Sequence, residues 1–173
     1  MSHRSPAVPA PTRFSPDRRF VLLAASALAA CAPAAVAGPD RYAASPFRRF
    51  SAADWKGRLP PASFDVLRQE GTERPFSSPL NDEHRKGTFA CLACGLPLFR
   101  SQWKFDSGTG WPSFYTALPG ALAKKTDLKL GVPRTEYHCA QCLGHQGHVF
   151  DDGPAPTGLR YCNNGVALKF IPA

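Results

Sequence analysis

The chain contains two Cys-x-x-Cys pairs, Cys91-Leu92-Ala93-Cys94 and Cys139-Ala140-Gln141-Cys142. This is the spacing of a zinc site built from four thiolates, Cys91, Cys94, Cys139 and Cys142. Because residues 95–138 separate the pairs, the metal would join two hairpins that are distant in the sequence instead of organising one small module. Four thiolates complete the coordination of zinc, so we expect a structural metal with no open position for a substrate.

Two interpretations compete with zinc at these cysteines. Each pair could form a disulfide in an oxidising compartment, or it could act as a redox centre. Two Cys-x-x-Cys pairs in one chain favour zinc more strongly than either pair alone would. Gly95 and Gly144 follow the pairs closely and supply the backbone freedom that such tight turns need.

Cys162 is the cysteine left over from this metal site. The chain has six cysteines, and the remaining one, Cys31, lies in an apolar N-terminal segment. Arg160 precedes Cys162 by two residues and Asn164 follows it by two, so on a strand the three side chains would share one face. A guanidinium beside a thiol favours the thiolate, which is the reactive form. The sequence therefore predicts a zinc-braced enzyme with one nucleophilic cysteine.

Length and charge limit the class of protein. A chain of 173 residues is about one domain plus an appendage, and its 18 prolines and 14 glycines predict short elements joined by many turns. The formal net charge is +8, to which residues 1–37 contribute several arginines. The remainder is moderately basic without a clustered stripe of Lys and Arg, so we expect no nucleic-acid partner.

Residues 1–37 have the order of an export signal. Arg18-Arg19 precedes the uncharged, alanine-rich stretch from Phe20 to Ala30, which is too short to span a bilayer comfortably. The paired arginines indicate the twin-arginine route, which carries folded proteins. We therefore expect export to the periplasm or cell envelope; the alternative is a disordered tail rich in Ala and Pro.

Two processing sites compete within this segment. Ala35-Val36-Ala37 before Gly38 fits the rule of small residues at a cleavage site. Leu28-Ala29-Ala30-Cys31 resembles a lipoprotein box, in which a lipid on Cys31 would tether the protein to a membrane. The sequence leaves both open.

The remainder reads as a tether, 38–50, followed by a mostly antiparallel β domain, 51–173. Ser51 to Asp54 is a capping signature before a short helical turn, and Pro60-Pro61 leads into a second helix over Ser63–Glu70 that Gly71 ends. Short β-branched or aromatic runs bounded by turn residues predict strands at Thr88–Cys91, Thr135–His138, Gly147–Phe150, Leu159–Cys162 and Ala167–Ile171.

Other residues are candidates for the site on chemical grounds. His145 and His148 follow the second cysteine pair on what looks like a loop entering a strand, and neutral imidazoles can donate or accept a proton. Trp111 lies in a glycine-rich turn, where it could line an apolar pocket or belong to the core. Arg160 could equally be a solvated charge, and Asn164 before Gly165 could be a turn residue with positive φ.

From about Asp54 to Ala173 the sequence resembles the methionine-R-sulfoxide reductase family, the B type of methionine sulfoxide reductase. Four stretches carry the resemblance: Gly71–Phe76, Phe105–Phe114, His145–Pro154 and Gly158–Cys162. The resemblance implies a mainly β fold of two small antiparallel sheets with short N-terminal helices, braced by one structural zinc per chain. It also implies the reduction of methionine-R-sulfoxide, in proteins or free.

The resemblance also implies roles for individual residues. The thiolate of Cys162 would attack the sulfoxide sulfur, while His145 and His148 would hydrogen-bond to the sulfoxide oxygen or protonate it. Cys162 would then be left as a sulfenic acid, which a thiol must reduce.

Three further positions complete the implied site. Arg160 would help to hold the thiolate, Asn164 would orient the site, and the ring of Trp111 would accept the methyl group of the sulfoxide. The partners implied are an oxidised substrate and a thioredoxin-like or other thiol reductant, and we expect a monomer.

The chain departs from the family at three positions. Many members have a resolving cysteine where this chain has Thr109, so we predict that an external thiol reduces Cys162 directly. If one of the zinc-binding cysteines acted as the resolving cysteine instead, the metal site would be lost. Asn163 and Gly165 replace the commoner Ile and Ser, which bears on the packing around the site.

Two other classes of protein share some of these features. A zinc-ribbon module for nucleic acid would explain the basic charge and the paired cysteines, but it leaves Cys162 without a role and conflicts with export. A thiol–disulfide oxidoreductase would use one Cys-x-x-Cys pair as its redox centre and would bind no zinc.

Overall fold

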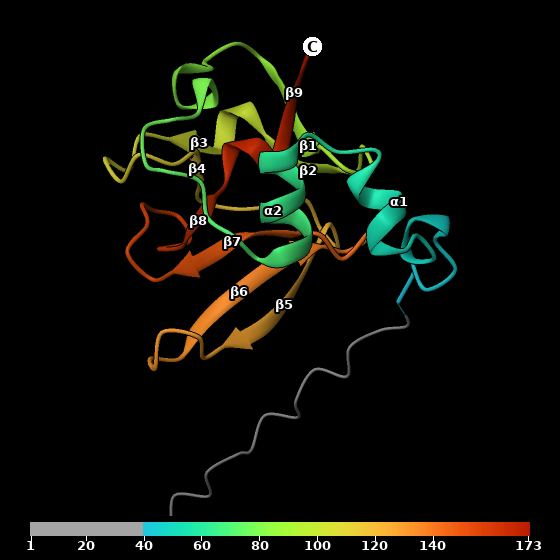
Figure 1. The fold of residues 1–173 in the computed structure, drawn as a ribbon. Helices are drawn as coiled ribbons and strands as arrows, with labels where there is room; N and C mark the ends of the chain where they lie inside the picture. Colours follow the sequence, from blue (N-terminus) through green and yellow to red (C-terminus); the bar gives the residue numbers. More distant parts are fainter. Residues whose placement is uncertain (1–39) are drawn as a thin grey trace, which may run out of the picture. The chain divides into compact units, whose positions relative to one another are not determined.

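The structure is a computed structural model that describes residues 40–173 (Figure 1). The predicted export signal at 1–37, with Cys31 and both cleavage sites, lies outside the described residues. The helices are η1(Pro46–Arg48), α1(Ala52–Lys56), α2(Pro61–Gln69), η2(Pro79–Asp82), η3(Ser101–Trp103) and η4(Gly165–Ala167). The strands are β1(Gly87–Cys91), β2(Pro97–Arg100), β3(Lys104–Phe105), β4(Ser113–Phe114), β5(Leu122–Asp127), β6(Arg134–Cys139), β7(His145–Phe150), β8(Arg160–Asn163) and β9(Leu168–Pro172). Among the described residues, no helix is long and apolar enough to cross a membrane.

The strands form two antiparallel sheets. The smaller has the order β2-β1-β9, and the larger has the order β3-β4-β8-β7-β6-β5. Figure 1 shows α2 beside β7, and the few helices are short. The predicted fold class, mainly β with two small antiparallel sheets and short N-terminal helices, is confirmed.

Aromatic side chains from both sheets form the core. Phe89 and Phe99 come from the smaller sheet and Phe114 and Tyr137 from the larger one, and all four are fully buried. The rings of Phe99 and Phe114 stack with centroids 4.1 Å apart, and Phe89 meets Phe114 edge-on at 5.0 Å. Such rings bury large apolar areas, so this contact between the sheets is a principal source of the stability of the domain.

Residues 46–50, which we expected to belong to a tether, pack on the domain. The rings of Phe47 and Phe50 lie 6.3 and 5.2 Å from the ring of Trp55, which is buried. Arg48 donates hydrogen bonds to the carbonyl oxygens of Ala140 and Gln141, at 2.6 and 3.3 Å. The aromatic residues in this segment explain the difference, because they bury apolar area that a solvated linker would leave exposed.

The first N-terminal helix matches the expected helical turn, whereas the second begins two residues earlier and ends one residue earlier than the expected span Ser63–Glu70. Ser51 and Asp54 form the capping box of α1, each side chain bonding the backbone N–H of the other residue. The second helix begins at Pro61 and ends at Gln69. Glu70, not Gly71, adopts the left-handed conformation with φ 57°, and the N–H of Gly71 then bonds to the carbonyl of Asp65.

The five predicted strands correspond to β1, β6, β7, β8 and β9, with ends shifted by one or two residues. The strands β2, β3, β4 and β5 are not predicted by the sequence pattern. Three of these are only two to four residues long. The strand β5 reads Leu-Ala-Lys-Lys-Thr-Asp and pairs with β6 alone, at the edge of the larger sheet. Its charged, exposed middle lacks the β-branched pattern typical of a strand.

Gly147 allows β7 and β8 to pair closely at the centre of the larger sheet. A Cβ atom at this position would overlap the carbonyl oxygen of Cys162 on the neighbouring strand. The backbone conformation of Gly147 is not the left-handed one, so the requirement is for space and not for a special φ.

We therefore expect Gly147→Ala to lower the free energy of unfolding by roughly 3 kcal/mol, because a backbone carbonyl cannot move aside without disturbing the strand pairing. Chemical denaturation of the purified domain measures this change. Gly57→Ala is the matched control, since its added methyl would meet only ordinary contacts beyond 3.6 Å. Equal stability of the Gly147→Ala variant and wild type would contradict the prediction.

Candidate active site and zinc centre

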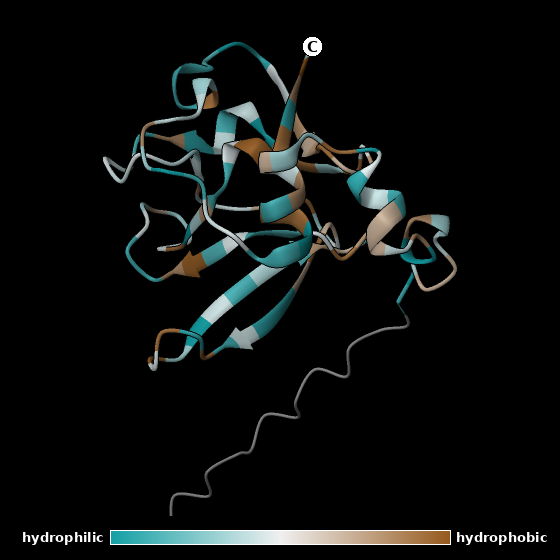
Figure 2. Cartoon of the chain, viewed as in Figure 1, coloured by the Kyte–Doolittle hydropathy of each residue, from teal (hydrophilic) through white to brown (hydrophobic). Residues whose placement is uncertain are grey.

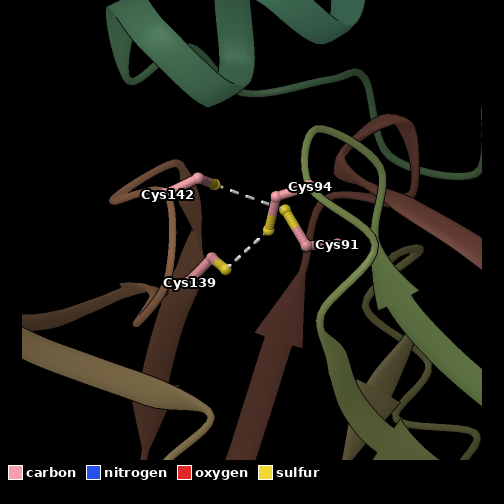
Figure 3. A group of neighbouring side chains, drawn as sticks. All are labelled: Cys91, Cys94, Cys139 and Cys142. Carbon is pink, nitrogen blue, oxygen red and sulfur yellow. Dashed lines mark hydrogen bonds between the residues drawn. The ribbon is translucent and has the colours of Figure 1, made fainter. Parts of the chain in front are cut away.

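The four paired cysteines meet between two hairpins. Cys91 and Cys94 lie on the turn from β1 to β2, and Cys139 and Cys142 lie on the turn from β6 to β7 (Figure 3). The sulfur atoms of Cys91 and Cys142 are 3.7 Å apart, and those of Cys94 and Cys139 are 3.5 Å apart. All four sulfurs lie within 4.8 Å of one another. The predicted connection between two hairpins distant in the sequence is thus observed, and it joins the two sheets.

These distances fit zinc and exclude disulfides in this structure. A tetrahedral site with Zn–S bonds of about 2.3 Å places its sulfurs about 3.8 Å apart, whereas bonded sulfurs are about 2 Å apart. The four cysteines are free thiols here. Arg68 adds a positive charge beside them: its Nη1 donates to the carbonyl of Cys142 at 2.8 Å. Its buried Nε and Nη2 have no hydrogen-bond partner among the described residues. Four thiolates around one Zn²⁺ carry net negative charge, which this guanidinium would balance.

The turns at the two pairs differ in how they achieve a tight backbone. At the first, Gly95 has φ 78° and its N–H bonds to the carbonyl of Cys91 at 2.8 Å, as the sequence predicts. At the second, Leu143 and not Gly144 adopts positive φ, 59°. Gly144 is needed for space, because a Cβ there would come within 2.8 Å of the side chain of Leu67 on α2.

One row of side chains crosses the larger sheet and contains Cys162. On β8, Cys162 lies directly opposite His148 of β7, which in turn lies opposite Glu136 of β6. On its other side Cys162 lies opposite Ser113 of β4. Directly opposed residues of antiparallel strands point to the same face, so the imidazole of His148 is the cross-strand neighbour of the thiol.

A bulge brings His145 to the same face as His148. Between the pairs Tyr137–Gly147 and His138–His145, β7 advances two residues while β6 advances one. On a regular strand, residues three apart point to opposite faces, and the additional residue restores the shared face. The two imidazole centroids are 5.5 Å apart. His145 was expected on a loop entering a strand, but it is the first residue of β7.

A pocket opens beside Cys162, and four of the six residues expected in the active site contribute to it. They are Trp111, His148, Cys162 and Asn164. Its remaining lining residues are Thr72, Arg134, Gly147, Phe150 and Asn163. The ring of His145 is buried behind His148 and lines a neighbouring pocket with Glu136 and Lys125. Arg160 lines a third pocket with Thr109 and Asp152.

Burial and positive charge act in opposite directions on the thiol of Cys162. Burial raises the pKa of Cys162, and the guanidinium of Arg160 and the hydroxyl of Thr109 oppose this rise. Arg160 is held in place by Asp152, whose two carboxylate oxygens accept from its Nε and Nη2 at 2.8 Å each. Its guanidinium also lies 4.4 Å from the centre of the ring of Phe150. Arg160 is therefore a buried, paired charge and not the solvated residue of the alternative interpretation.

Each histidine is paired with a carboxylate that the sequence analysis missed. Nε2 of His148 is 2.8 Å from Asp127, and Nδ1 of His145 is 2.8 Å from Glu136. A carboxylate accepts, so the bonded ring nitrogen carries the proton and the other nitrogen remains free for a ligand. Burial lowers the pKa of His145, with Glu136 opposing the effect. The pKa of Asp127 lies well below its usual range because the N–H of Lys129 and the imidazole of His148 donate to it.

Glu73, also missed, fixes Trp111 and the end of β8. The backbone carbonyl of Glu73 accepts from Nε1 of Trp111 at 3.2 Å. Its carboxylate accepts from the N–H groups of Gly165 and Val166, which begin η4. Glu73 lies in Gly71–Phe76 and Asp152 lies in His145–Pro154, two of the stretches that carry the family resemblance. Both residues could therefore have been proposed from these motifs. No motif in the sequence analysis marked Asp127.

Asn164 uses its side-chain amide to connect two segments of the site. Its Oδ1 accepts from the N–H of Glu73 at 3.0 Å, and its Nδ2 donates to the carbonyl of Gln146 at 3.0 Å. Its φ is −69°, so the alternative of a turn residue with positive φ is wrong.

The two unusual residues near Cys162 are explained by their neighbours. Asn163 is fully buried and accepts a hydrogen bond from the hydroxyl of Tyr137 at 2.9 Å, while its amide donates to the side chain of Gln146. A buried polar group with such partners is not a packing fault. At Gly165, a Cβ would overlap the hydroxyl of Ser78, so glycine fits this chain where a larger residue would not.

Comparison with known proteins matches residues 59–172 to the SelR domain family. A curated protein of Thiobacillus denitrificans named peptide methionine sulfoxide reductase MsrB is 53% identical over 121 residues, which are 69% of this chain and 92% of that protein. Proteins of the same name from Agrobacterium fabrum and Leptospira interrogans are 50% and 52% identical. The matched segments cover 74% and 68% of this chain and 96% and 90% of those proteins.

Substituting Arg160 tests the electrostatics of the site. We expect Arg160→Met to raise the pKa of Cys162 further, because burial would then act without the opposing guanidinium. The rate of alkylation of Cys162, followed by mass spectrometry across a pH range, should reach its half-maximum at higher pH. Arg134→Met is the matched control, since Arg134 lines the same pocket but is not among the groups that shift the pKa of Cys162. An unchanged profile in Arg160→Met would show that Arg160 does not act on the thiol.

Proposed function

The chain belongs to the methionine-R-sulfoxide reductase family, and from this we propose how its own residues perform the reaction of the family. The enzyme reduces methionine-R-sulfoxide in proteins and is itself restored by a thiol reductant. The arrangement that carries the proposal is the cross-strand pair of Cys162 and His148 at the wall of a pocket that also contains Trp111. Cys91, Cys94, Cys139 and Cys142 would hold a zinc ion, which would be structural because four thiolates complete its coordination.

In the proposed step, the thiolate of Cys162 attacks the sulfoxide sulfur. A bond between the two sulfur atoms forms as the sulfoxide oxygen takes up a proton. The sulfur–sulfur and sulfur–oxygen bonds then break as the hydroxyl moves to the sulfur of Cys162, which becomes a sulfenic acid, and methionine leaves. The substrate sulfur gains two electrons and the sulfur of Cys162 loses two. The methyl group of the substrate lies against the ring of Trp111, which the hydrogen bond to Glu73 holds in place.

We assign the protonation of the oxygen to His148, because it is the histidine that lines the pocket with Cys162. Asp127 accepts from Nε2 of His148, which leaves Nδ1 as the nitrogen that meets the substrate. The carboxylate of Asp127, whose pKa is held well below its usual range, stays ionised and fixes the orientation of the ring that donates the proton. His145, buried behind it and bound to Glu136, supports the ring of His148. Asn164 orients the site through Glu73 and Gln146.

The proposed regeneration uses no second cysteine of this domain. The four other cysteines of the described residues belong to the zinc centre, and Thr109 stands where many relatives carry a resolving cysteine. Two equivalents of an external thiol, or one thioredoxin-like dithiol, would return Cys162 to the thiol and release water.

We also propose that the enzyme is a monomer, which light scattering during gel filtration would check.

The reaction is tested with residues 38–173 and dithiothreitol, following each epimer of N-acetyl-methionine sulfoxide separately. We expect loss of the R epimer only, and no detectable turnover by Cys162→Ser, because serine is not ionised at neutral pH. One turnover without reductant should leave a sulfenic acid on Cys162 that a 1,3-dicarbonyl reagent captures. A disulfide in place of the sulfenic acid would contradict the one-cysteine cycle. No loss of either epimer by a folded, zinc-loaded domain would contradict the mechanism as a whole.

We further propose that the protein is exported to the periplasm or cell envelope by its N-terminal segment. The support is the order of Arg18-Arg19, the apolar stretch Phe20–Ala30 and the small residues before Gly38. The SelR match begins at residue 59, so this segment is additional to the catalytic domain. Two processing routes fit this proposal: cleavage before Gly38, or a lipid on Cys31 that tethers the protein to a membrane.

Export is tested by fractionating cells that express the full chain. We expect the protein in the envelope fraction, and we expect Arg18→Lys with Arg19→Lys to leave it in the cytoplasm, because the twin-arginine route depends on both guanidinium groups. Cys31→Ala separates the two processing routes: a lipoprotein would lose its membrane attachment, whereas a protein cleaved before Gly38 would be unaffected. Cytoplasmic location of the wild-type chain would contradict export.

A further inference from the structure

The turn between β5 and β6 exposes three large apolar side chains. Leu128, Leu130 and Val132 are 63%, 70% and 65% exposed. The N–H of Gly131 bonds to the carbonyl of Leu128, and Gly131 has φ 74°, so the segment folds into a tight turn that presents the three side chains to solvent. Figure 2 shows this turn as an apolar, brown end on a hairpin whose strands are largely hydrophilic. We call residues 128–132 the apolar tip.

The apolar tip is attached directly to the wall of the active site. Asp127, which precedes it, accepts from His148, and Arg134, two residues after Val132, lines the pocket that contains Cys162. Asp127 and Arg134 also pair with each other across the hairpin, at 2.6 Å between Oδ2 and Nη2. A polypeptide long enough to extend beyond the pocket on this side would therefore meet the apolar tip.

The charges around the tip do not favour an anionic partner. The basic residues of the segment 127–134 are Lys129 and Arg134, and each is held in an ion pair, with Glu70 and Asp127 respectively. Their positive charges are therefore offset by neighbouring carboxylates. The surface offered is apolar and locally neutralised, which matches an uncharged apolar segment of polypeptide.

We propose that the apolar tip is a docking surface for unfolded, apolar segments of the oxidised protein substrate. The inference rests on the proposed function and adds the surface of this chain that would hold the polypeptide around the methionine sulfoxide. Methionine is usually buried among apolar residues, and its oxidation introduces a polar group that disrupts such a core. The sequence around a methionine sulfoxide is thus often apolar and exposed by unfolding. The tip would bury part of that sequence while the sulfoxide enters the pocket.

The test compares a large and a small substrate in the triple variant Leu128→Ser, Leu130→Ser, Val132→Ser. With peroxide-oxidised β-casein, a disordered protein, we expect KM to rise roughly tenfold, equivalent to about 1.4 kcal/mol of lost binding. With N-acetyl-methionine-R-sulfoxide, which is too small to reach the tip, we expect kcat and KM to remain those of wild type. Ile171→Ser is the matched control, because it removes an exposed apolar side chain from β9 of the other sheet.

Each of the other outcomes would contradict the inference for a different reason. Equal losses with both substrates would mean that the turn acts on the pocket through Asp127 and Arg134 and is not a docking surface. Unchanged kinetics with both substrates would show that the tip binds no polypeptide. Loss of binding to phosphatidylglycerol vesicles, with unchanged kinetics on β-casein, would make the tip a membrane contact. A wild-type enzyme inactive on both substrates would contradict the proposed function itself, independently of the tip.

Discussion

The meeting of four cysteine sulfurs at a site that fits one zinc ion is the constraint on which the rest of the domain depends. Each of the two sheets contributes one hairpin turn with two cysteines, so a zinc ion bound there would join the two sheets. Cys142 lies three residues before His145, and the start of β7 is therefore fixed by this site. Arg68 and Arg48 add hydrogen bonds to the carbonyls of this second turn, which reinforces it from α2 and from the N-terminal segment.

The active site combines a buried nucleophile with charges that are themselves held by partners. Burial protects the thiol of Cys162 but disfavours its ionised form, and Arg160 offsets part of that cost because Asp152 fixes the guanidinium beside it. The same arrangement recurs at the histidines, each of which has its own carboxylate. Groups that are fixed before the substrate arrives need no rearrangement during the reaction, and such preorganisation is a principal source of catalytic power.

Much of this site could be predicted because its residues lie close together in the sequence. Spacing alone indicated the zinc ligands, and the alternation of a strand indicated that Arg160 and Cys162 share a face. Asp127 and Glu136 could not be predicted, since their contacts depend on the pairing of β5, β6 and β7 and on a bulge. The segment 46–50 was expected to be a linker because its few residues show no periodicity, yet its aromatic rings find a buried partner in Trp55. Whether such residues belong to the site or to the core depends on contacts between distant segments, which the local sequence pattern does not predict.

The bulge in β7 has a consequence for how this sequence can change over evolutionary time. One end of β7 follows the turn that contains Cys139 and Cys142, and His148 in the interior of the strand is in register with Cys162. Between these fixed points, a substitution changes one side chain, but an insertion or deletion would reverse the face of every residue on one side of it. The number of residues from Cys142 to His148 is therefore constrained as strictly as the identities of Gly144 and Gly147 between them. Over evolutionary time Leu143 could be exchanged, but a change in the length of the segment would separate the cysteine site from the histidines.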